Sequence, residues 1–299
     1  MNSFPDFLDM YSMPFIKMEG IGNDYIYFDF TDRSFESKNI NTNVIPIICN
    51  RRYGIGSDGI VIIANNKEQD NIKMYMWNSD GSYSKICGNA LRCVAYYWYK
   101  KKNIKEFYIE SGAFLHKATI IEDKGASGVV KIQMGYPIFE KEEIPFYGNK
   151  KSQSLYIFYE PEIFPYVGYV VSMGNPHCVF FVDDPDSIEI EVVGSKIENH
   201  PLFPERTNVE FIKINPDKTI YQRTWERGSG ETLACGSGAC ASHIVGVLEK
   251  ALPKKNIIHL KGGDLIIEWE EQIWMTGNAT LIYSGNLIKD LGEKLFINS

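Results

Sequence analysis

The feature that most constrains the fold of this 299-residue chain is an internal repeat. Three short landmarks of the first half recur in the second half in the same order: Gly22-Asn23 and Gly174-Asn175, Asn78 and Glu226, and Cys87-Gly88 and Cys235-Gly236. Asn78 and Glu226 each precede the following cysteine by nine residues, and the outer landmarks repeat at intervals of 152 and 148 residues. A repeat of this length predicts two homologous domains, which we expect to face each other.

Hydrophobic periodicity predicts similar elements around the landmarks of each half. In the first half we expect a strand pair over 15–30 bent at Gly22-Asn23, a short helix over 44–53, strands at 59–64, 72–77, 107–121 and 129–134, and a long helix over 87–101. In the second half we expect strands at 169–172, 179–182, 209–214 and 219–225, helices at 193–199 and 236–250, and strand patterns from there to the C-terminus. Each half therefore combines several strands with one long helix.

Composition excludes several classes of partner. Hydrophobic residues make up 44% of the chain, which suffices for a sizeable core. The net charge of −7 and the pI of about 5.4 argue against a nucleic acid or an anionic membrane surface. We find no apolar run of the ~20 residues that a membrane helix needs. Residues 1–13 contain Asp6 and Asp9 and lack Lys and Arg, unlike a signal or transit peptide, so we expect a cytoplasmic protein.

The chain has six cysteines, at positions 49, 87, 93, 178, 235 and 240. A disulfide framework is the weaker interpretation for a long chain without an export signal. Zinc is also disfavoured, because the closest pairs are spaced too widely for a zinc knuckle. We expect Cys49, Cys93, Cys178 and Cys240 to be small core residues. Cys87 and Cys235 differ because both precede a glycine at the start of a predicted helix.

The two cysteine turns share one local design, in which a glycine-containing loop leads to Cys, Gly and a helix. The first N–H groups of a helix lack intrahelical acceptors and carry partial positive charge, so an amino-acid carboxylate fits there. The same field favours a thiolate and predicts a lowered cysteine pKa. If both turns meet at one pocket, one sulfur lies on each face of a bound carbon. That arrangement predicts a two-base epimerase, in which one thiolate removes an α-proton and the other thiol returns a proton.

Two other classes of function stay open at this point. A thiol nucleophile with His177 as its base would perform acyl transfer, but that chemistry does not explain two matched cysteines. A binding protein for an amino acid would explain the carboxylate site, but it gives no reason for thiols. Deuterium transfer from solvent to the α-carbon of a substrate separates binding alone from catalysis.

Two long motifs resemble those of the diaminopimelate epimerase family. The first is the run Asn78-Ser79-Asp80-Gly81-Ser82 followed by 87–93, and the second is 226–232 followed by 234–240. Further blocks that resemble the family lie at 15–25, 174–177 and 206–209, so the similarity covers about 14–299. The chain departs from the common pattern at Ala90, where Gly is usual, and at Ser237, where Thr is usual.

The resemblance implies an α/β (α+β) fold of two pseudo-symmetric domains, each with a curved, mostly antiparallel sheet or barrel around a central helix. The expected boundaries are 14–133 for the N-terminal domain and 134–280 for the C-terminal domain, with the last strand, 281–299, returning to the first. It further implies no pyridoxal phosphate and no metal, a small-molecule substrate and a homodimer.

The resemblance also assigns roles to residues. Cys87 and Cys235 would be the acid–base pair, supported by His177 and Glu226. Gly88, Asn89, Gly236 and Ser237 would bind the α-carboxylate. The distal end of the substrate would meet Asn23, Asn78, Asn208 and Arg227, with the substrate-binding residue Asn175 nearby. An Arg offers the paired donors that suit a carboxylate. The implied reaction interconverts LL- and meso-diaminopimelate, for lysine and peptidoglycan precursor biosynthesis. The alternative within the same chemistry is a racemase for another amino acid, such as histidine or proline.

Overall fold

The computed structural model describes residues 11–33, 35–66, 71–140, 143–152 and 154–296. Contacts divide the chain into two compact units. Unit 1 ends at Val130 and resumes at Asn278, and unit 2 runs from Lys131 to Gly277. Most of the N-terminal extension at 1–13 lies outside the described residues, and the first strand begins at Tyr11. Among the described residues, no helix combines the length and apolar character needed to cross a bilayer.

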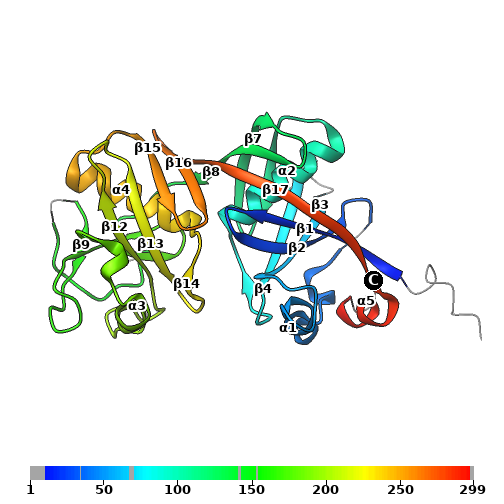
Figure 1. Cartoon of the computed structure of the whole chain (residues 1–299), viewed down its shortest axis with the longest axis horizontal. Helices are drawn as coiled ribbons and strands as arrows, with labels where there is room; N and C mark the ends of the chain where they lie inside the picture. The colour runs from blue at the N-terminus through cyan, green and yellow to red at the C-terminus, as the bar shows by residue number, and fades with distance from the viewer. Residues whose placement is uncertain (1–10, 34, 67–70, 141–142, 153, 297–299) are drawn as a thin grey trace, which may run out of the picture. The chain divides into compact units, whose positions relative to one another are not determined.

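Unit 1 is a sheet wrapped around one long helix (Figure 1). Its elements are β1 (Tyr11–Gly20), β2 (Asn23–Phe30), α1 (Ile45–Cys49), β3 (Gly59–Asn66), β4 (Asn71–Asn78), β5 (Tyr83–Ser84), α2 (Gly88–Lys102), β6 (Glu106–Ser111), β7 (Phe114–Asp123), the start of β8 (Ser127–Gly135), the end of β17 (Ile273–Ile288) and α5 (Lys289–Leu295). The short 3₁₀ helices at Ser37–Asn39 and Thr42–Val44 precede α1.

Strand pairing closes the sheet of unit 1 into a barrel. β1 pairs antiparallel with both β17 and β2, and the order continues through β3, β4, β6 and β7. β8 follows β7 after a turn in which the N–H of Lys124 donates to the carbonyl of Ser127, and it also pairs with β17. The helix α2 lies inside against β1, β2 and β7. Its buried residues fall in the first two and a half turns, and the helix ends at Asn103 in the left-handed conformation.

Unit 2 has the same architecture around a second long helix (Figure 1). Its elements are the end of β8, β9 (Tyr156–Phe158), β10 (Gly168–Ser172), β11 (Pro176–Phe181), a 3₁₀ helix (Pro185–Ser187), α3 (Ile190–Glu198), β12 (Asn208–Ile214), β13 (Ile220–Glu226), β14 (Gly230–Thr232), α4 (Gly236–Lys250), β15 (Lys255–Leu260), β16 (Gly263–Trp269) and the start of β17. The helix α4 contacts β10, β11, β12, β13, β15 and β16.

The pairing pattern of one unit repeats in the other. The parallel pairs β2–β3 and β4–β6 correspond to β11–β12 and β13–β15. The antiparallel pairs β3–β4, β4–β5 and β6–β7 correspond to β12–β13, β13–β14 and β15–β16. Even the register agrees, because Trp77 lies opposite Ile60 just as Trp225 lies opposite Val209. The predicted fold of two similar barrels, each around a central helix, is therefore confirmed.

Several details differ from the sequence prediction, among them the short helix expected over 44–53, which covers only Ile45–Cys49. The turn between β1 and β2 has Ile21 and Gly22 at its centre, both with positive φ, while Asn23 already belongs to β2. This type of two-residue turn matches the twist of the flanking strands. The strand pattern expected from the long helix of unit 2 to the C-terminus is confirmed as far as Ile288 and is wrong beyond it, because Lys289–Leu295 forms the helix α5. Its Leu295, with the adjacent Phe296, packs into the apolar cluster of unit 1 that includes Phe28 and Phe30.

Candidate functional site

Cys87 caps the N-terminus of α2. Its backbone is extended, with φ −145° and ψ 113°, and its sulfur accepts the N–H of Ala90 at 3.5 Å. The thiol lies 3.8 Å from Asn23 Oδ1, which accepts its proton. The strand β2 thus brings one of the predicted substrate residues, Asn23, to the first cysteine. A sulfur that already accepts a helix-terminal N–H is suited to carry negative charge.

Cys235 occupies the matching position at the N-terminus of α4, with φ −108° and ψ 109°. The residue is 4% exposed, and its sulfur lies 3.6 Å from Ser237 Oγ. Burial raises the pKa of the Cys235 thiol well above its usual value, and the carboxyl groups of Glu226 and Glu210 raise it further. The expected lowering of the pKa by the helix start is therefore wrong for Cys235, since desolvation and nearby negative charge outweigh the contributions of Ser237 and the Gly238 N–H.

Strand alternation gathers polar side chains on the face of the unit 2 sheet that covers α4. Asn208 lies beside His177, and Glu210 lies opposite Thr224. Side chains two residues apart share a face, so Asn208 and Glu210 on β12 point the same way, while Val209 and Phe211 join the apolar cluster on the other side. A buried polar surface therefore forms where α4 begins.

His177 is the centre of a hydrogen-bonded chain that leads to Cys235. Its Nδ1 lies 2.8 Å from Glu210 Oε1, and its Nε2 lies 3.1 Å from Asn175 Oδ1. The Asn175 amide Nδ2 donates to Ser237 Oγ at 3.5 Å, and this hydroxyl is the one beside the Cys235 sulfur. The His177 ring itself is fully buried. The structure thus joins His177, Asn175, Ser237 and Cys235, all of them predicted site residues.

Glu226 ends β13 near the same cysteine. Its Oε1 accepts the hydroxyl of Thr232 at 2.5 Å. Desolvation raises the pKa of Glu226, while hydrogen bonds from Thr232 and the Cys235 thiol lower it. A carboxyl group in contact with a thiol, both with raised pKa values, forms a pair that can hold or pass a proton.

The predicted residues for the distal end of the substrate take part in local hydrogen bonds. Asn208 Nδ2 donates to the Pro176 carbonyl at 2.9 Å, and its Oδ1 accepts the backbone N–H of Arg227 at 3.0 Å. The Arg227 guanidinium donates to the Glu205 carbonyl at 3.0 Å. In unit 1, Asn78 Nδ2 donates to Ser82 Oγ at 3.0 Å. Asn208 and Arg227 are thus brought together, and Asn78 is held in its own turn.

Sequence reasoning missed three buried charged residues that support these positions. Arg92 is fully buried in α2 and donates to Asn89 Oδ1 at 2.8 Å and to the Gly88 carbonyl at 3.5 Å. Glu198 accepts the N–H of Gly228 at 2.8 Å, which fixes the turn that carries Arg227. Glu210 is the third. The alternation of β12 counted from Asn208 could have placed Glu210 in the site, because an acidic residue inside an apolar strand is unusual.

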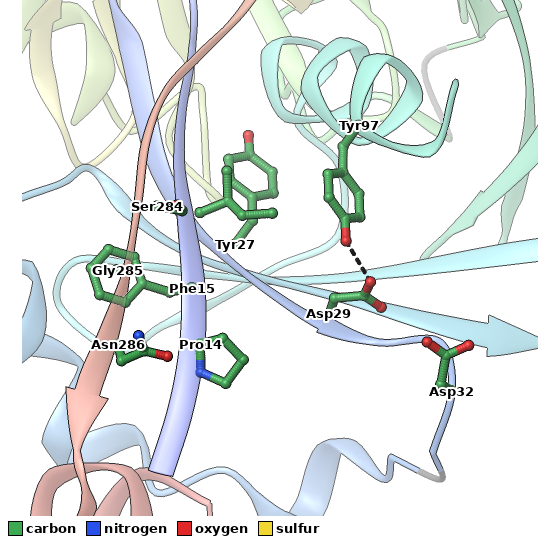
Figure 2. A pocket seen from close by; sticks show the side chains of 10 residues that line it. Pro14, Phe15, Tyr27, Asp29, Asp32, Tyr97, Ser284, Gly285 and Asn286 are labelled. Atoms are coloured by element: carbon green, nitrogen blue, oxygen red, sulfur yellow. Dashed lines mark hydrogen bonds between the residues drawn. The ribbon is translucent and has the colours of Figure 1, made fainter. Parts of the chain in front are cut away.

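A hollow of about 410 Å³ lies on unit 1 away from these contacts (Figure 2). Figure 2 shows the Tyr97 hydroxyl on Asp29, and the lining also includes Tyr27, Asp32 and Asn286. None of the predicted site residues lines it. The candidate functional residues of each unit therefore lie at its cysteine turn and not at this hollow.

A family model described as "Diaminopimelate epimerase" matches residues 15–140 and 169–282. The chain is 40% identical to the diaminopimelate epimerase of Methanococcus maripaludis over 92% of its own length and 99% of that protein. It is 40% identical to the same enzyme of Acetivibrio thermocellus, with 94% and 100% covered, and 41% identical to that of Leptospira biflexa, with 91% and 98% covered.

Solved structures share the fold at low sequence identity. A hydroxyproline epimerase from Agrobacterium vitis matches with a TM-score of 0.66 and 12% identity, covering 93% of each chain. A phenazine biosynthesis protein from Enterococcus faecalis matches with a TM-score of 0.63 and 14% identity, covering 92% of this chain and 99% of the other. At such identity the likeness concerns the fold alone.

Proposed function

Because the chain belongs to the diaminopimelate epimerase family, we propose that it interconverts LL- and meso-2,6-diaminopimelate by inverting one α-carbon, without a cofactor. The reaction would serve lysine and peptidoglycan precursor biosynthesis. The observation that carries the proposal is the pair of matched helix starts, where Cys87 and Cys235 occupy the N-cap positions of α2 and α4. Folding does not require a cysteine at a helix N-cap. Proton transfer on both faces of one carbon, however, requires two acid–base groups.

Both thiols act on the same α-carbon, one from each face. With its raised pKa, Cys235 rests as a thiol and supplies a proton. In the direction of reaction in which Cys235 supplies the proton, Cys87 removes the α-proton as a thiolate, and its sulfur accepts a helix N–H. The roles exchange in the reverse reaction. Each transfer moves one proton between sulfur and carbon, so charge balances without a redox step.

The α-carboxylate is bound at the helix starts, by Gly88 and Asn89 of α2 and by Gly236 and Ser237 of α4. Negative charge spreads onto this carboxylate as the α-proton leaves, and helix-terminal N–H groups stabilise it most at that moment. His177 and Glu226 lie beside the Cys235 end of the site and act on the amino group and the thiol.

The distal amino and carboxylate groups are recognised by Asn23, Asn78, Asn175, Asn208 and Arg227. Asn208 is oriented by its hydrogen bonds to the Pro176 carbonyl and the Arg227 N–H, and Asn78 by its bond to Ser82 within the turn after β4. A site built for a second polar end discriminates against a substrate that lacks it, because its buried donors then stay unpaired.

Incubation of the purified protein with LL-diaminopimelate in deuterated water, without added cofactor, tests the reaction. We expect meso product with one α-deuterium. Activity on a single-carboxylate amino acid alone, such as proline or histidine, would replace the proposed substrate. If neither diaminopimelate nor a single-carboxylate amino acid takes up deuterium, the protein binds without catalysis and the proposed epimerase activity is rejected.

Replacement of either Cys87 or Cys235 by Ala tests the two-thiol scheme. We expect kcat to fall by at least about 10³-fold in each variant, because each thiol is the sole proton carrier on its face. The matched controls are Cys93→Ala and Cys240→Ala, which remove the second cysteine of each helix and should leave kcat nearly unchanged. Wild-type turnover in either N-cap variant would exclude the scheme.

The protein acts as a homodimer in the cytoplasm, as the family resemblance implies. Sedimentation equilibrium tests the assembly, and a mass of a single 34.2 kDa chain at micromolar concentration would contradict it.

A further inference from the structure

Glu210 is the most deeply buried carboxyl group beside the candidate site. It lies on β12 with its side chain fully buried, and Oε1 is 2.8 Å from His177 Nδ1. Within the described part of the chain, Oε2 has no hydrogen-bond partner. Burial raises the pKa of Glu210, and His177 acts in the opposite direction. A carboxyl group in such a place costs stability unless it shares a proton or a charge with its neighbour.

The other half of the molecule shows that the fold does not need this acid. The register places Val61 opposite Met76 in unit 1, at the position of Glu210 opposite Thr224 in unit 2. Tyr25, beside Gly59, stands at the position of His177, beside Asn208. The same barrel is thus built with an apolar residue where unit 2 has a buried acid.

The two helices also differ at the position that faces this strand residue. A Cβ atom added to Gly238 would lie 2.5 Å from Glu210 Oε1, so an alanine there would displace the carboxyl group. The matching residue of α2, three positions after Cys87, is Ala90. Gly238 therefore makes the space that Glu210 occupies, and unit 1 has Ala90 with Val61 instead. A glycine is less favourable than alanine inside a helix, so the space for Glu210 comes at a cost to the helix.

The hydrogen-bond directions define what Glu210 does for its neighbours. Asn175 Nδ2 donates to Ser237, so Asn175 Oδ1 accepts and His177 carries a proton on Nε2. His177 Nδ1 then either donates to the Glu210 carboxylate or accepts from the protonated acid. In both cases one proton is shared between Glu210 and Nδ1, and the ring keeps the orientation that holds Asn175 and Ser237 beside Cys235.

We propose that Glu210 is a positioning residue for the half of the reaction that takes place at Cys235: it shares a proton with His177 Nδ1 and so orients the chain His177–Asn175–Ser237 next to the sulfur. The inference rests on the proposed function for its kinetic consequence. The hydrogen bond itself can be tested without a substrate.

The test uses full-length variants in which residues of unit 2 are replaced by their counterparts in unit 1. The double variant Glu210→Val with Gly238→Ala installs the pair found as Val61 and Ala90, which removes the clash between the added Cβ atom and the Glu210 carboxyl group. Glu210→Gln is the conservative variant, because its amide can still donate to Nδ1 of a neutral His177. Circular dichroism and thermal unfolding check that both variants are folded. His177→Gln identifies the His177 signals among the five histidines in nitrogen-15 spectra.

In nitrogen-15 spectra of the wild type, we expect His177 Nδ1 to give the signal of a protonated or hydrogen-bonded nitrogen. In the double variant, we expect it to give the signal of an unprotonated nitrogen without a hydrogen bond. We expect kcat for diaminopimelate to fall about 100-fold in the double variant with KM within about threefold, and Glu210→Gln to stay within about tenfold of wild type. Unchanged Nδ1 signals, or a folded double variant with wild-type kcat, would overturn the inference, as would a Glu210→Gln variant as slow as the double variant. If the wild type does not turn over diaminopimelate, the proposed function fails while the spectra still decide this inference.

Discussion

At the scale of single residues, Cys87 and Cys235 occupy the same place in the repeat but meet different surroundings. Cys87 accepts a helix N–H and contacts the neutral Asn23 amide. Cys235 is more deeply buried and lies close to two carboxyl groups, Glu226 and Glu210. The helix start is common to both thiols, so the difference in environment comes from the strands around each helix.

The raised pKa of Cys235 predicts its alkylation behaviour. In a Cys87→Ala variant, the rate of iodoacetamide labelling at Cys235, mapped by mass spectrometry, should still increase above the ordinary thiol pKa of 9.0, because only the thiolate reacts and its formation is shifted upward. Glu226→Gln in the same background should move the profile to lower pH by removing a neighbouring carboxyl group. Labelling that levels off below about pH 8 would contradict the assignment of Cys235 as the resting thiol.

At the scale of elements, α4 is held inside its barrel by close polar and apolar contacts. Residues 238–246 of this helix are buried. They include His243, whose Nε2 lies 3.1 Å from the Lys254 carbonyl, and within the described residues its Nδ1 has no hydrogen-bond partner. Burial lowers the pKa of His243 to about 4. The central helix therefore contains a histidine that must stay neutral for the fold to be stable.

His243 predicts an acid-sensitive fold. Between its ordinary pKa of 6.5 and the folded value of about 4, the unfolded chain binds the proton and the folded chain does not, so stability is present above pH 6.5 and is lost as the pH falls. The loss approaches about 3 kcal/mol at the lower limit. In urea titrations at pH 7 and about pH 4.5, His243→Gln should lose less stability than the wild type. His259→Gln, at a half-exposed site, is the control, and an equal loss in all three proteins would refute the prediction.

At the scale of the whole molecule, the C-terminal segment belongs to the same unit as the first strand. The residues after Asn278 belong to unit 1, where β17 pairs with β1 from Glu19 opposite Thr280 to Met13 opposite Leu287. Phe296 then packs on Phe28 and Phe30, with ring centroids 5.2 Å and 4.9 Å apart. The C-terminal segment thus completes both the barrel and the apolar cluster of unit 1.

Phe296→Ala should destabilise unit 1 specifically. The ring is 3% exposed, and loss of a buried Phe typically costs about 3–5 kcal/mol. Amide hydrogen exchange should show lost protection in the described residues of unit 1, up to Val130 and from Asn278, with 131–277 retained. Ile288→Ala removes an exposed side chain near the same end and should change little. Equal loss in both units would contradict the assignment of the C-terminal segment to unit 1.

The sequence alone predicts the repeat, the helix starts at Cys87 and Cys235, and most of the strands. These features depend on periodicity and glycine placement, which act over neighbouring residues. The long helix expected from Gly236 to about Lys250 is confirmed as Gly236–Lys250. The contacts that distinguish the two thiols were not readable, since Glu210 reaches His177 only when β11 and β12 pair in register over α4. The sequence therefore determined which groups are available for chemistry. The tertiary structure decided their proton affinities, because burial and charges from distant strands set them.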